Sequence, residues 1–378
     1  MRIAIVCDWL VVIGGAEKFL GHLLQCFPEA DLFAVVDFIE PDKRDFLLNK
    51  SIKTTFIQHL PFAKHRYRTY LPLMPLAIEQ LDVSSYDVII SSSHAVAKGV
   101  LTGPDQLHIS YVHSPMRYAW DLQHHYLRET GLDKKMRGYL ARWFLHKLRL
   151  WDLRSANGVD YFIANSDFIA RRIHKTYRRQ AEIMHPPIDT AQFTAGKQAK
   201  EDFYFTASRF VPYKKLDLIV ESFQSMPDKK LIVIGDGPDA DKIKSKSGKN
   251  VQFLGYQPTT VLIDYMQRAN AFIFAAQEDF GLLPLEAQAC GTPVIAFGKG
   301  GALETVRGLH DKHPTGVFFP EQTTQAICAA IDIFEKNAAY ITAENCVQQA
   351  ARFNPQQFQQ KFKQFIQDKW RQHCDSLR

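Results

Sequence analysis

Short runs of hydrophobic residues alternate along the chain with stretches in which hydrophobic residues recur every three or four positions. The first run, residues 2–7 (RIAIVC), is rich in β-branched residues and predicts a strand buried on both faces. Five hydrophobic residues then follow with the spacing of a helix: Phe19, Leu20, Leu23, Leu24 and Phe27. Further strand-like runs occupy 32–36, 88–90, 109–112 and 161–164. Strands that alternate with helices predict a parallel sheet covered on both faces.

The same alternation begins again after Pro186 and Pro187. Five runs predict buried strands at 203–206, 231–234, 251–254, 271–274 and 294–296, and helical stretches occupy 216–223, 259–268 and 282–289. Residues 188–202 are polar and irregular, as expected of a linker. We therefore predict two α/β domains, 1–187 and 188–352, each with a doubly wound parallel sheet. Residues 353–378 form an amphipathic helix, with Pro355 in the first turn, where proline is tolerated, and we expect this helix to return to the N-terminal domain.

Composition agrees with a two-domain globular protein. The chain has 378 residues, of which 46% are hydrophobic and 23% charged, which excludes disorder or a fibrous repeat as a description of the whole. No apolar run reaches the roughly 18–20 residues of a membrane span. The first ten residues make a poor signal peptide, and the six cysteines include no Cys-x-x-Cys pair. We therefore expect a cytoplasmic protein without disulfides or structural zinc.

Positive charge is concentrated in the first half. Residues 1–185 hold 24 Lys and Arg against 19 Asp and Glu, a net of +5, whereas residues 186–378 hold 22 against 21, a net of +1. Segment 134–154 alone carries seven basic residues and one Asp, interleaved with aromatic residues, and 65–75 is similar in character. Two interpretations have equal weight: a helix on an anionic membrane surface, or a helix packed on the sheet with a solvated cationic edge. We expect no nucleic-acid partner.

The segment 278–286 (EDFGLLPLE) places two carboxylates around a glycine where a strand passes into a helix. In a parallel sheet this junction lies at the carboxyl edge, where ligands bind. Gly281 would let a ligand approach the backbone, and the helix N-terminus offers N–H groups to an anion. Glu278 and Glu286 could accept hydrogen bonds from hydroxyl groups. The alternative is that both are ordinary surface or capping acids.

Arg209 and Lys214 lie five residues apart after the first strand of the second half, at the same edge. Two cations there could neutralise a diphosphate, with arginine as a fork and lysine as a point charge. A solvated basic turn is the alternative. Gly14 and Gly15 open a helix after the first strand and suggest a phosphate cradle, although the full G-x-G-x-x-G pattern of a dinucleotide site is absent.

A histidine and an Asp-x-Asp sequence could also take part in chemistry. His113 ends a predicted strand, where it could act as a neutral hydrogen-bonding group or a base, or could be structural. We expect it to face a cleft between the domains. Asp239-Ala-Asp241 has the Asp-x-Asp pattern of a possible metal site. It lies at the predicted start of a helix, however, where aspartate is favoured because it caps the N-terminus. We therefore expect no metal.

Taken together, these residues resemble glycosyltransferase family 4, the retaining transferases of the GT-B fold. The segment 278–296 (EDFGLLPLEAQACGTPVIA) is the most specific part, and the Arg209 and Lys214 pair, the Gly14-Gly15 turn and His113 follow the family's order. Residues 91–99 (SSSHAVAKG) and 111–121 (YVHSPMRYAWD) resemble bacterial mannosyltransferases of O-antigen and cell-surface polysaccharide assembly.

The resemblance implies a role for each site residue. Arg209 and Lys214 would hold the donor diphosphate, Glu286 the ribose, and Glu278 with the amides of Phe280, Gly281 and Leu282 the donor sugar. Gly15 would approach the diphosphate or the reacting centre, and His113 would line the site near the transferred sugar. Backbone near Gly255 and Tyr256 would read the base.

It also implies a substrate pair. The enzyme would move mannose from GDP-mannose to a lipid-linked saccharide bound on the N-terminal domain, on the inner face of the membrane and without metal. A UDP-sugar transferase of the same fold, a GT-B epimerase or hydrolase, and a silent binding protein are the alternatives.

Overall fold

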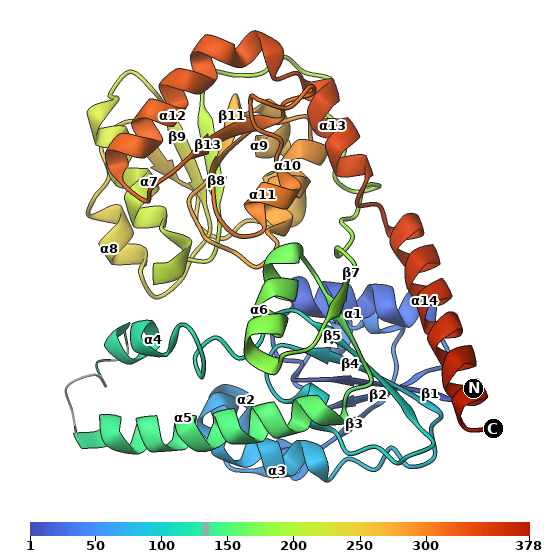
Figure 1. The fold of residues 1–378 in the computed structure, drawn as a ribbon. Helices are drawn as coiled ribbons and strands as arrows, with labels where there is room; N and C mark the ends of the chain where they lie inside the picture. The colour runs from blue at the N-terminus through green and yellow to red at the C-terminus, as the bar shows by residue number, and fades with distance from the viewer. Residues whose placement is uncertain (130, 132–135) are drawn as a thin grey trace. The chain divides into compact units, whose positions relative to one another are not determined.

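The computed structural model describes residues 1–129, 131 and 136–378. The chain divides into two compact units (Figure 1). The first, unit 1, comprises residues 1–186 together with 358–378, and the second, unit 2, comprises residues 187–357. Each unit is built around one parallel sheet, as the alternation of strands and helices predicts.

Unit 1 contains a seven-stranded sheet in the order β3-β2-β1-β4-β5-β6-β7, with every neighbouring pair parallel. Its strands are β1 (Ile3–Cys7), β2 (Asp31–Ala34), β3 (Ile52–Thr54), β4 (Val88–Ser93), β5 (Leu107–Val112), β6 (Tyr161–Ala164) and β7 (Ala181–Ile183). Its helices are α1 (Gly15–Cys26), α2 (Ala63–Arg66), α3 (Met74–Glu79), α4 (Gln123–Glu129), α5 (Met136–Ser155) and α6 (Asp167–Tyr177).

Alternate residues of β1 face two different layers of helices, because successive side chains of a strand point to opposite faces. Ile5 and Cys7 pack in a core cluster with α1 and with the C-terminal helix α14 (Pro355–Ser376). Ala4 and Val6 pack in a second cluster with α3 and α5. The chain's last helix therefore returns to the first sheet, as the fold prediction expected, and covers it through Phe358, Phe362 and Ile366.

Unit 2 repeats this architecture with a six-stranded parallel sheet in the order β10-β9-β8-β11-β12-β13. Its strands are β8 (Tyr204–Ala207), β9 (Leu231–Ile234), β10 (Val251–Phe253), β11 (Ala271–Phe274), β12 (Val294–Phe297) and β13 (Gly316–Phe319). Its helices are α7 (Leu216–Ser222), α8 (Ala240–Lys244), α9 (Thr259–Arg268), α10 (Leu282–Ala289), α11 (Ala302–Thr305), α12 (Thr324–Asn337) and α13 (Ala343–Ala351). Helices α9 and α10 cover one face of the sheet, and α7 and α12 cover the other.

Hydrophobic runs located the buried strands well, and the structure confirms β6, β9 and β11 with the predicted bounds. Three strands were missed. β3 and β7 are three-residue edge strands with a partly exposed pattern, so neither forms a continuous apolar run. β13 also lies at a sheet edge and begins with a glycine, a residue that is depleted in strands.

Candidate functional site

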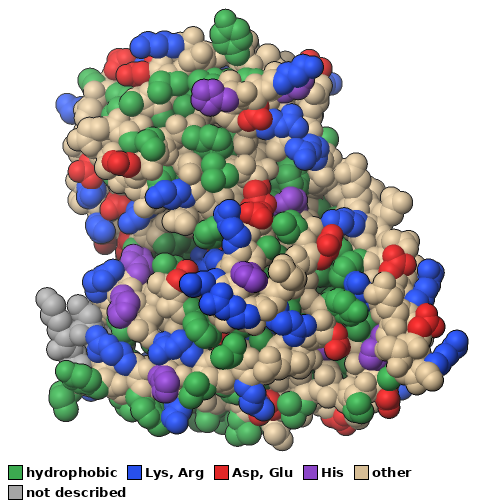
Figure 2. Space-filling model, viewed as in Figure 1, with side chains coloured by type: hydrophobic (Ala, Val, Ile, Leu, Met, Phe, Trp, Pro, Cys, Tyr) green, Lys and Arg blue, Asp and Glu red, His purple; other side chains and the backbone are tan. Residues whose placement is uncertain are grey.

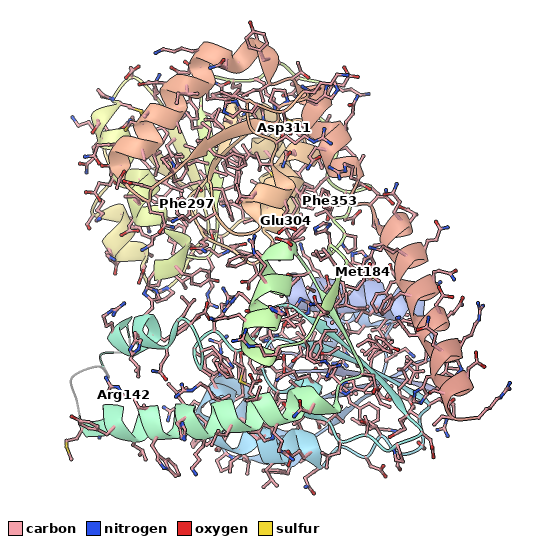
Figure 3. The ribbon with its side chains drawn as sticks, viewed as in Figure 1. Arg142, Met184, Phe297, Glu304, Asp311 and Phe353 are labelled. Atoms are coloured by element: carbon pink, nitrogen blue, oxygen red, sulfur yellow. The ribbon has the colours of Figure 1, made fainter. Side chains whose placement is uncertain are left out.

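Charged loops gather at the carboxyl edge of the sheet in unit 2. The strands β8, β9, β11 and β12 are parallel neighbours, so the loops that follow Ala207, Ile234, Phe274 and Phe297 leave the same edge. Phe297 is labelled in Figure 3. This edge holds Arg209 and Lys214 after β8 and Glu278 after β11, as the sequence predicted from strand order.

Lys214 and Glu278 form an ion pair between Nζ and Oε1. Their side chains are only 14% and 18% exposed, so the two charges are largely withdrawn from water. Lys214 ends a short 3-10 turn, Pro212–Lys214, and its ammonium lies over the Tyr213 ring at 5.3 Å. Arg209 lies on the same loop with an exposed side chain. The structure therefore joins one of the two predicted cations to one of the two predicted acids.

Two glycines fix the backbone of the Glu278 loop. The N–H of Gly301 donates to the carbonyl of Glu278 at 2.9 Å. A Cβ at Gly300 would overlap that carbonyl, and one at Gly301 would overlap the backbone of Phe280. Only glycine allows the two turns to pack this closely.

Gly281 begins helix α10 in a left-handed conformation, with φ of +88°. Glycine has no side chain that could accept a hydrogen bond. The N-cap residue Gly281 therefore gives the N–H groups in the first turn of α10 no side-chain acceptor. Glu286 lies one turn into the helix and is buried, at 7% exposure. Phe280 is also buried, whereas Leu282 is partly exposed.

A second glycine turn supports the Arg209 loop. A Cβ at Gly235 would overlap the carbonyl of Ser208, and one at Gly237 would lie 2.5 Å from the carbonyl oxygen of Phe210. Phe210 N–H in turn donates to the carbonyl of Asp236 at 2.9 Å. The turn after β9 thus holds the loop that carries Arg209.

Beside this turn, the carbonyl of Gly255 accepts from the N–H of Gly235 at 2.9 Å. Gly255 has a φ of +68°, and the next residue, Tyr256, is 83% exposed. The residues expected to read the base therefore follow β10 at the same edge of the sheet.

In unit 1, His113 follows β5 at the carboxyl edge. Its Nε2 lies 2.8 Å from Ser92 Oγ, and its ring packs edge-on against Phe19 and Tyr111. Burial lowers the pKa of His113 to about 3, and the neighbouring His94 acts in the same direction. His113 is therefore a neutral hydrogen-bonding group at physiological pH.

The glycine turn of unit 1 is occupied by a side chain of its own helix. Gly14 is the N-cap of α1, and its N–H donates to Glu17 Oε2 at 2.9 Å. Gly15 begins the helix. Burial raises the pKa of Glu17. The amide of Gly14, expected to face a phosphate, is thus engaged by a carboxylate.

Sequence reasoning missed a buried pair at the end of β1. Asp8 is 1% exposed, and its Oδ2 lies 3.0 Å from His94 Nδ1. Burial raises the pKa of Asp8, but His94 and backbone N–H donors outweigh burial and lower it to about 2. The available signal was an acid placed directly after the first buried strand, at the edge where ligands bind.

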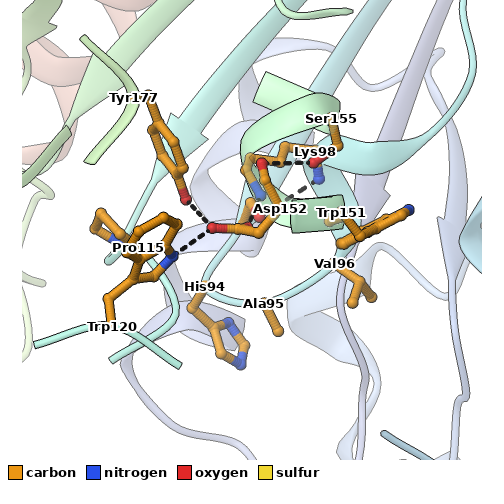
Figure 4. A network of polar contacts seen from close by, with 12 residues as sticks. His94, Ala95, Val96, Lys98, Pro115, Trp120, Trp151, Asp152, Ser155 and Tyr177 are labelled. Atoms are coloured by element: carbon orange, nitrogen blue, oxygen red, sulfur yellow. Dashed lines mark hydrogen bonds and ion pairs between the residues drawn. The ribbon is translucent and has the colours of Figure 1, made fainter. Parts of the chain in front are cut away.

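Another buried network connects the two segments that carried the mannosyltransferase resemblance (Figure 4). Lys98 forms an ion pair with Asp152, and both are almost fully buried. Asp152 also accepts from Trp120 Nε1 at 2.7 Å and from the Tyr177 hydroxyl at 2.9 Å. These segment residues therefore serve to hold α5 on the sheet.

Helix α5 buries one side and exposes the other along its length. Gly138, Leu148 and Asp152 are buried, and Phe144, Leu145 and Trp151 pack on the core. The exposed side carries the hydrophobic residues Met136, Tyr139, Leu140 and Trp143 at 59–85%, followed by Leu150 and Leu153 at 52% and 41%. Arg142 is partly exposed (Figure 3), and Arg137 and Lys147 are exposed. The structure confirms the predicted helix, while Lys134 and Lys135 lie outside the described residues.

In the part of the chain that the structure describes, no group of three or more His, Cys, Asp or Glu side chains is placed to hold a metal ion. Asp239 and Asp241 lie at the start of α8. None of the helices in the described ranges combines the length and the hydropathy of a membrane span.

Solved structures share this architecture over almost the whole chain. The Anabaena protein Alr3699/HepE, solved in complex with UDP, aligns with a TM-score of 0.71 at 17% identity and covers 97% of this chain and 100% of that one. Sucrose-phosphate synthase from Thermosynechococcus elongatus aligns with a TM-score of 0.74 at 16% identity, over 97% and 99%. At such low identity, the likeness establishes the fold alone.

Sequence comparisons agree. A D-inositol 3-phosphate glycosyltransferase of Mycobacterium avium is 31% identical over 174 residues, which are 39% of this chain and 41% of that protein. The chain thus spans about two fifths of the length of the curated relatives it matches. The model of Glycosyltransferase Family 4 matches residues 13–192, and that of Glycosyl transferases group 1 matches residues 187–353. The chain therefore carries a Glycosyltransferase Family 4 domain followed by a Glycosyl transferases group 1 domain, on the two parallel-sheet units of a GT-B fold.

Proposed function

We propose that this protein is a retaining hexosyltransferase that moves mannose from GDP-mannose to a lipid-linked saccharide in cell-surface polysaccharide synthesis. The observation that carries the proposal is the largely buried Lys214–Glu278 pair at the carboxyl edge of the second sheet, with Arg209 on the same loop as Lys214. Mannose and the lipid-linked acceptor rest on the resemblance of residues 91–99 and 111–121 to bacterial mannosyltransferases.

The chemistry requires positive charge where the nucleotide departs. As the sugar leaves through an oxocarbenium-like transition state, negative charge grows on the diphosphate, and a preorganised donor there contributes about 3–4 kcal/mol. Arg209 and Lys214 are the cations assigned to this task. The acceptor attacks from the face that the diphosphate leaves, and the departing phosphate takes the acceptor's proton, which gives retention without a protein nucleophile.

The remaining residues hold the donor. Glu286 would bind the ribose, and Glu278, with the amides of Phe280, Gly281 and Leu282, would bind the sugar. Because Lys214 is already paired with Glu278, donor binding would exchange part of this ion pair for contacts with phosphate and sugar.

In unit 1, His113 would serve as a neutral hydrogen-bonding group beside the transferred sugar. Gly15 would approach the reacting centre. Gly255 and Tyr256 in unit 2 would contact the base.

Nucleotide binding tests the donor site directly. A ligand that binds the folded state raises the unfolding temperature, so GDP, UDP and ADP can be compared on the intact protein. We expect GDP to stabilise the wild type most, and Arg209→Ala or Lys214→Ala to abolish both this shift and turnover without unfolding the protein. Lys244→Ala, which removes an exposed cation from α8 in the same unit, is the matched control. Wild-type turnover in either site variant would remove the diphosphate assignment.

The same experiment separates the donor alternatives. A larger shift with UDP would favour a UDP-sugar donor, a possibility supported by the UDP complex of the structurally similar Anabaena protein. Product analysis distinguishes the reaction type: a saccharide product supports transfer, whereas free sugar or an epimer formed without acceptor would indicate a hydrolase or epimerase.

We further propose that the exposed side of α5 binds an anionic membrane surface. Its four most exposed hydrophobic residues could enter the headgroup region, while Arg137, Arg142 and Lys147 pair with lipid phosphates. Figure 2 shows basic, histidine and hydrophobic side chains interspersed over the region of α4 and α5. This location would bring the enzyme to a lipid-linked acceptor at the inner face of the membrane.

Vesicle co-sedimentation tests the membrane proposal. Arg137→Ser with Lys147→Ser should weaken binding to vesicles containing phosphatidylglycerol, and added salt should weaken wild-type binding similarly. Lys197→Ser with Lys244→Ser removes the same charge from exposed positions of unit 2 and is the control. If both double variants bind like the wild type, the cationic edge of α5 is merely solvated.

A further inference from the structure

Buried polar side chains connect three helices of unit 2, two of which begin at the loops assigned to the donor. Helix α10 packs beside both α11 and α13 (Figure 1). Each of these helices contributes one polar residue to the contact: Gln288, Thr305 and Gln349, whose exposed fractions are 0%, 0% and 1%. Glutamine and threonine are seldom buried so completely, and their hydrogen bonds therefore indicate what they do.

Gln288 joins α10 to α11. Its Nε2 donates to the carbonyl of Pro284 in its own helix at 2.9 Å and to the carbonyl of Thr305, the last residue of α11, at 3.0 Å. Both donors of the amide group are thus used. Residues two positions apart in a helix do not face each other. Gln288 therefore holds α10 from a different side than the one on which Glu286 lies.

The hydrogen bonds continue from Thr305 to the Glu278 loop. The carbonyl of Thr305 also accepts from Gln349 Nε2 of α13 at 3.2 Å. The Thr305 hydroxyl donates to the carbonyl of Gly301, one turn earlier, at 3.2 Å. The N–H of Gly301 in turn donates to the carbonyl of Glu278 at 2.9 Å. An unbroken series of contacts therefore leads from Gln288 to the loop that carries Glu278.

This series connects the two acids assigned to the donor. Glu286 lies on α10, two residues before Gln288, whereas Glu278 lies on the loop that Gly301 fixes. The separation of the two carboxylates therefore depends on how α10 is placed relative to α11. Backbone hydrogen bonds within each helix do not set that placement, but the Gln288 amide does, because it is bonded to both helices.

Packing alone does not require a glutamine at this position. Gln288 Oε1 is buried, and it has no hydrogen-bond partner among the residues that the structure describes. A buried oxygen without a partner destabilises the folded state. Methionine has a similar volume and adapts to irregular space, so it could fill the site without this cost. A polar residue that costs stability and is not needed for packing indicates a functional role.

We propose that Gln288 is a positioning residue for donor binding: by joining α10 to α11, it sets Glu286 and the Glu278 loop at the separation that a nucleotide-sugar requires. Thr305 and Gln349 complete the network that transmits this placement. The inference rests on the proposed function, which supplies the ligand. Gln288 acts through the two acids and need not touch the donor itself.

Gln288→Met in the intact protein separates positioning from stability. Calorimetric titration with GDP, UDP and ADP measures nucleotide binding, and urea unfolding measures stability. For the nucleotide that the wild type binds most tightly, we expect the Kd of the variant to rise about threefold or more. The urea midpoint should stay the same or rise, because the unpaired oxygen is removed. A glutamine with a merely structural role would give the opposite result: a lower midpoint and an unchanged Kd.

Ser222→Ala is the matched control. It removes a buried hydroxyl of α7 that donates to the carbonyl of Ile219 at 2.6 Å, outside the network. We expect it to lower the urea midpoint and to leave the Kd of the nucleotide unchanged.

Hydrogen exchange followed by mass spectrometry tests the link without any nucleotide. Gln288→Met should speed exchange in segment 299–305, which contains the Gly301 amide, whereas Ser222→Ala should not. Unchanged exchange or an unchanged Kd in Gln288→Met overturns the positioning role. If that variant does not fold, Gln349→Met, which removes the other amide from the network, is subjected to the same two measurements. A wild type that binds none of the three nucleotides would refute the proposed function, and exchange alone would then decide whether Gln288 couples the helices.

Discussion

The buried ion pair between Lys98 and Asp152 allows a sharp test of how α5 is held on the first sheet. Asp152 is fully buried and accepts from three groups: the Lys98 ammonium, Trp120 Nε1 and the Tyr177 hydroxyl. The Lys98 ammonium also lies 5.3 Å from the centre of the Tyr177 ring. Figure 4 shows these contacts converging on one carboxylate. We therefore expect Asp152 to stabilise unit 1 more than any surface charge of the same helix.

The magnitude follows from what each change leaves behind. Removing one partner of a buried ion pair costs about 3–5 kcal/mol, because the remaining charge is desolvated and unpaired. In Asp152→Ala, Trp120 and Tyr177 would also lose their acceptor, and an unsatisfied buried donor costs about 1–3 kcal/mol. Since these contributions overlap, we expect a loss of at least about 4 kcal/mol, a large share of the roughly 5–15 kcal/mol that stabilises a typical protein.

Asp152→Asn separates charge from shape. The amide oxygen can still accept from Trp120 and Tyr177, but the amide NH2 group then faces the Lys98 ammonium, donor against donor. We expect this isosteric change to cost about 3 kcal/mol or more. Adding Lys98→Met to it removes the stranded charge, so the double variant should be more stable than Asp152→Asn alone.

Urea unfolding of the intact protein, followed by far-UV circular dichroism, measures these differences as shifts of the first transition. Arg154→Ala is the control, because it removes a largely exposed partner of Glu79 from the same helix and should cost less than about 1 kcal/mol. Strictly additive effects of Lys98→Met and Asp152→Asn would refute the reasoning, since the two side chains would then not interact.

Two further changes test other parts of the structure. Gly301→Ala should abolish the nucleotide-induced rise in unfolding temperature, because its Cβ would overlap Phe280 and displace the Glu278 loop; Gly103→Ala, with its nearest contact at 3.6 Å, should not. Burial lowers the pKa of His108 to about 4. The unfolded chain therefore protonates this histidine below about pH 6.5, whereas the folded chain protonates it only below about pH 4. Stability should therefore fall by about 2 kcal/mol per such histidine between pH 7 and pH 5, and denaturation of His108→Gln should show a shallower fall.

Sequence alone predicted most of the fold because buried parallel strands are continuous apolar runs. The run at Tyr161–Ala164 is apolar on both faces and was found with its bounds. β3 and β7 were not found, because an edge strand is covered on fewer sides and needs no apolar run to be stable. The local pattern of hydrophobic residues thus predicts burial. It does not predict a strand that is stabilised mainly by pairing with its neighbour in the sheet.

The same limit explains which parts of the candidate site were predictable. Lys214 and Glu278 follow strands whose order could be inferred, so their common edge could be predicted. Asp8 and the backbone it caps at His94 are 86 residues apart, and Lys98 and Asp152 are 54 apart. No local spacing connects such partners. Helix α5 could be recognised as basic and aromatic, but which of its sides packs on the sheet depends on the ion pair of Asp152 with the distant Lys98.

Glycines at the second sheet's edge show how the charged loops are kept in place. A glycine pair at such an edge suggests a cradle for phosphate. At Gly235 and Gly301, however, backbone atoms of a neighbouring loop occupy the space that a side chain would take. Their effect on a ligand is therefore indirect. By letting loops pack backbone to backbone, they hold Arg209 and Glu278 where a charged ligand would meet them, without reorganisation at the moment of reaction. A side chain at either glycine should consequently impair nucleotide binding although no ligand atom need touch it.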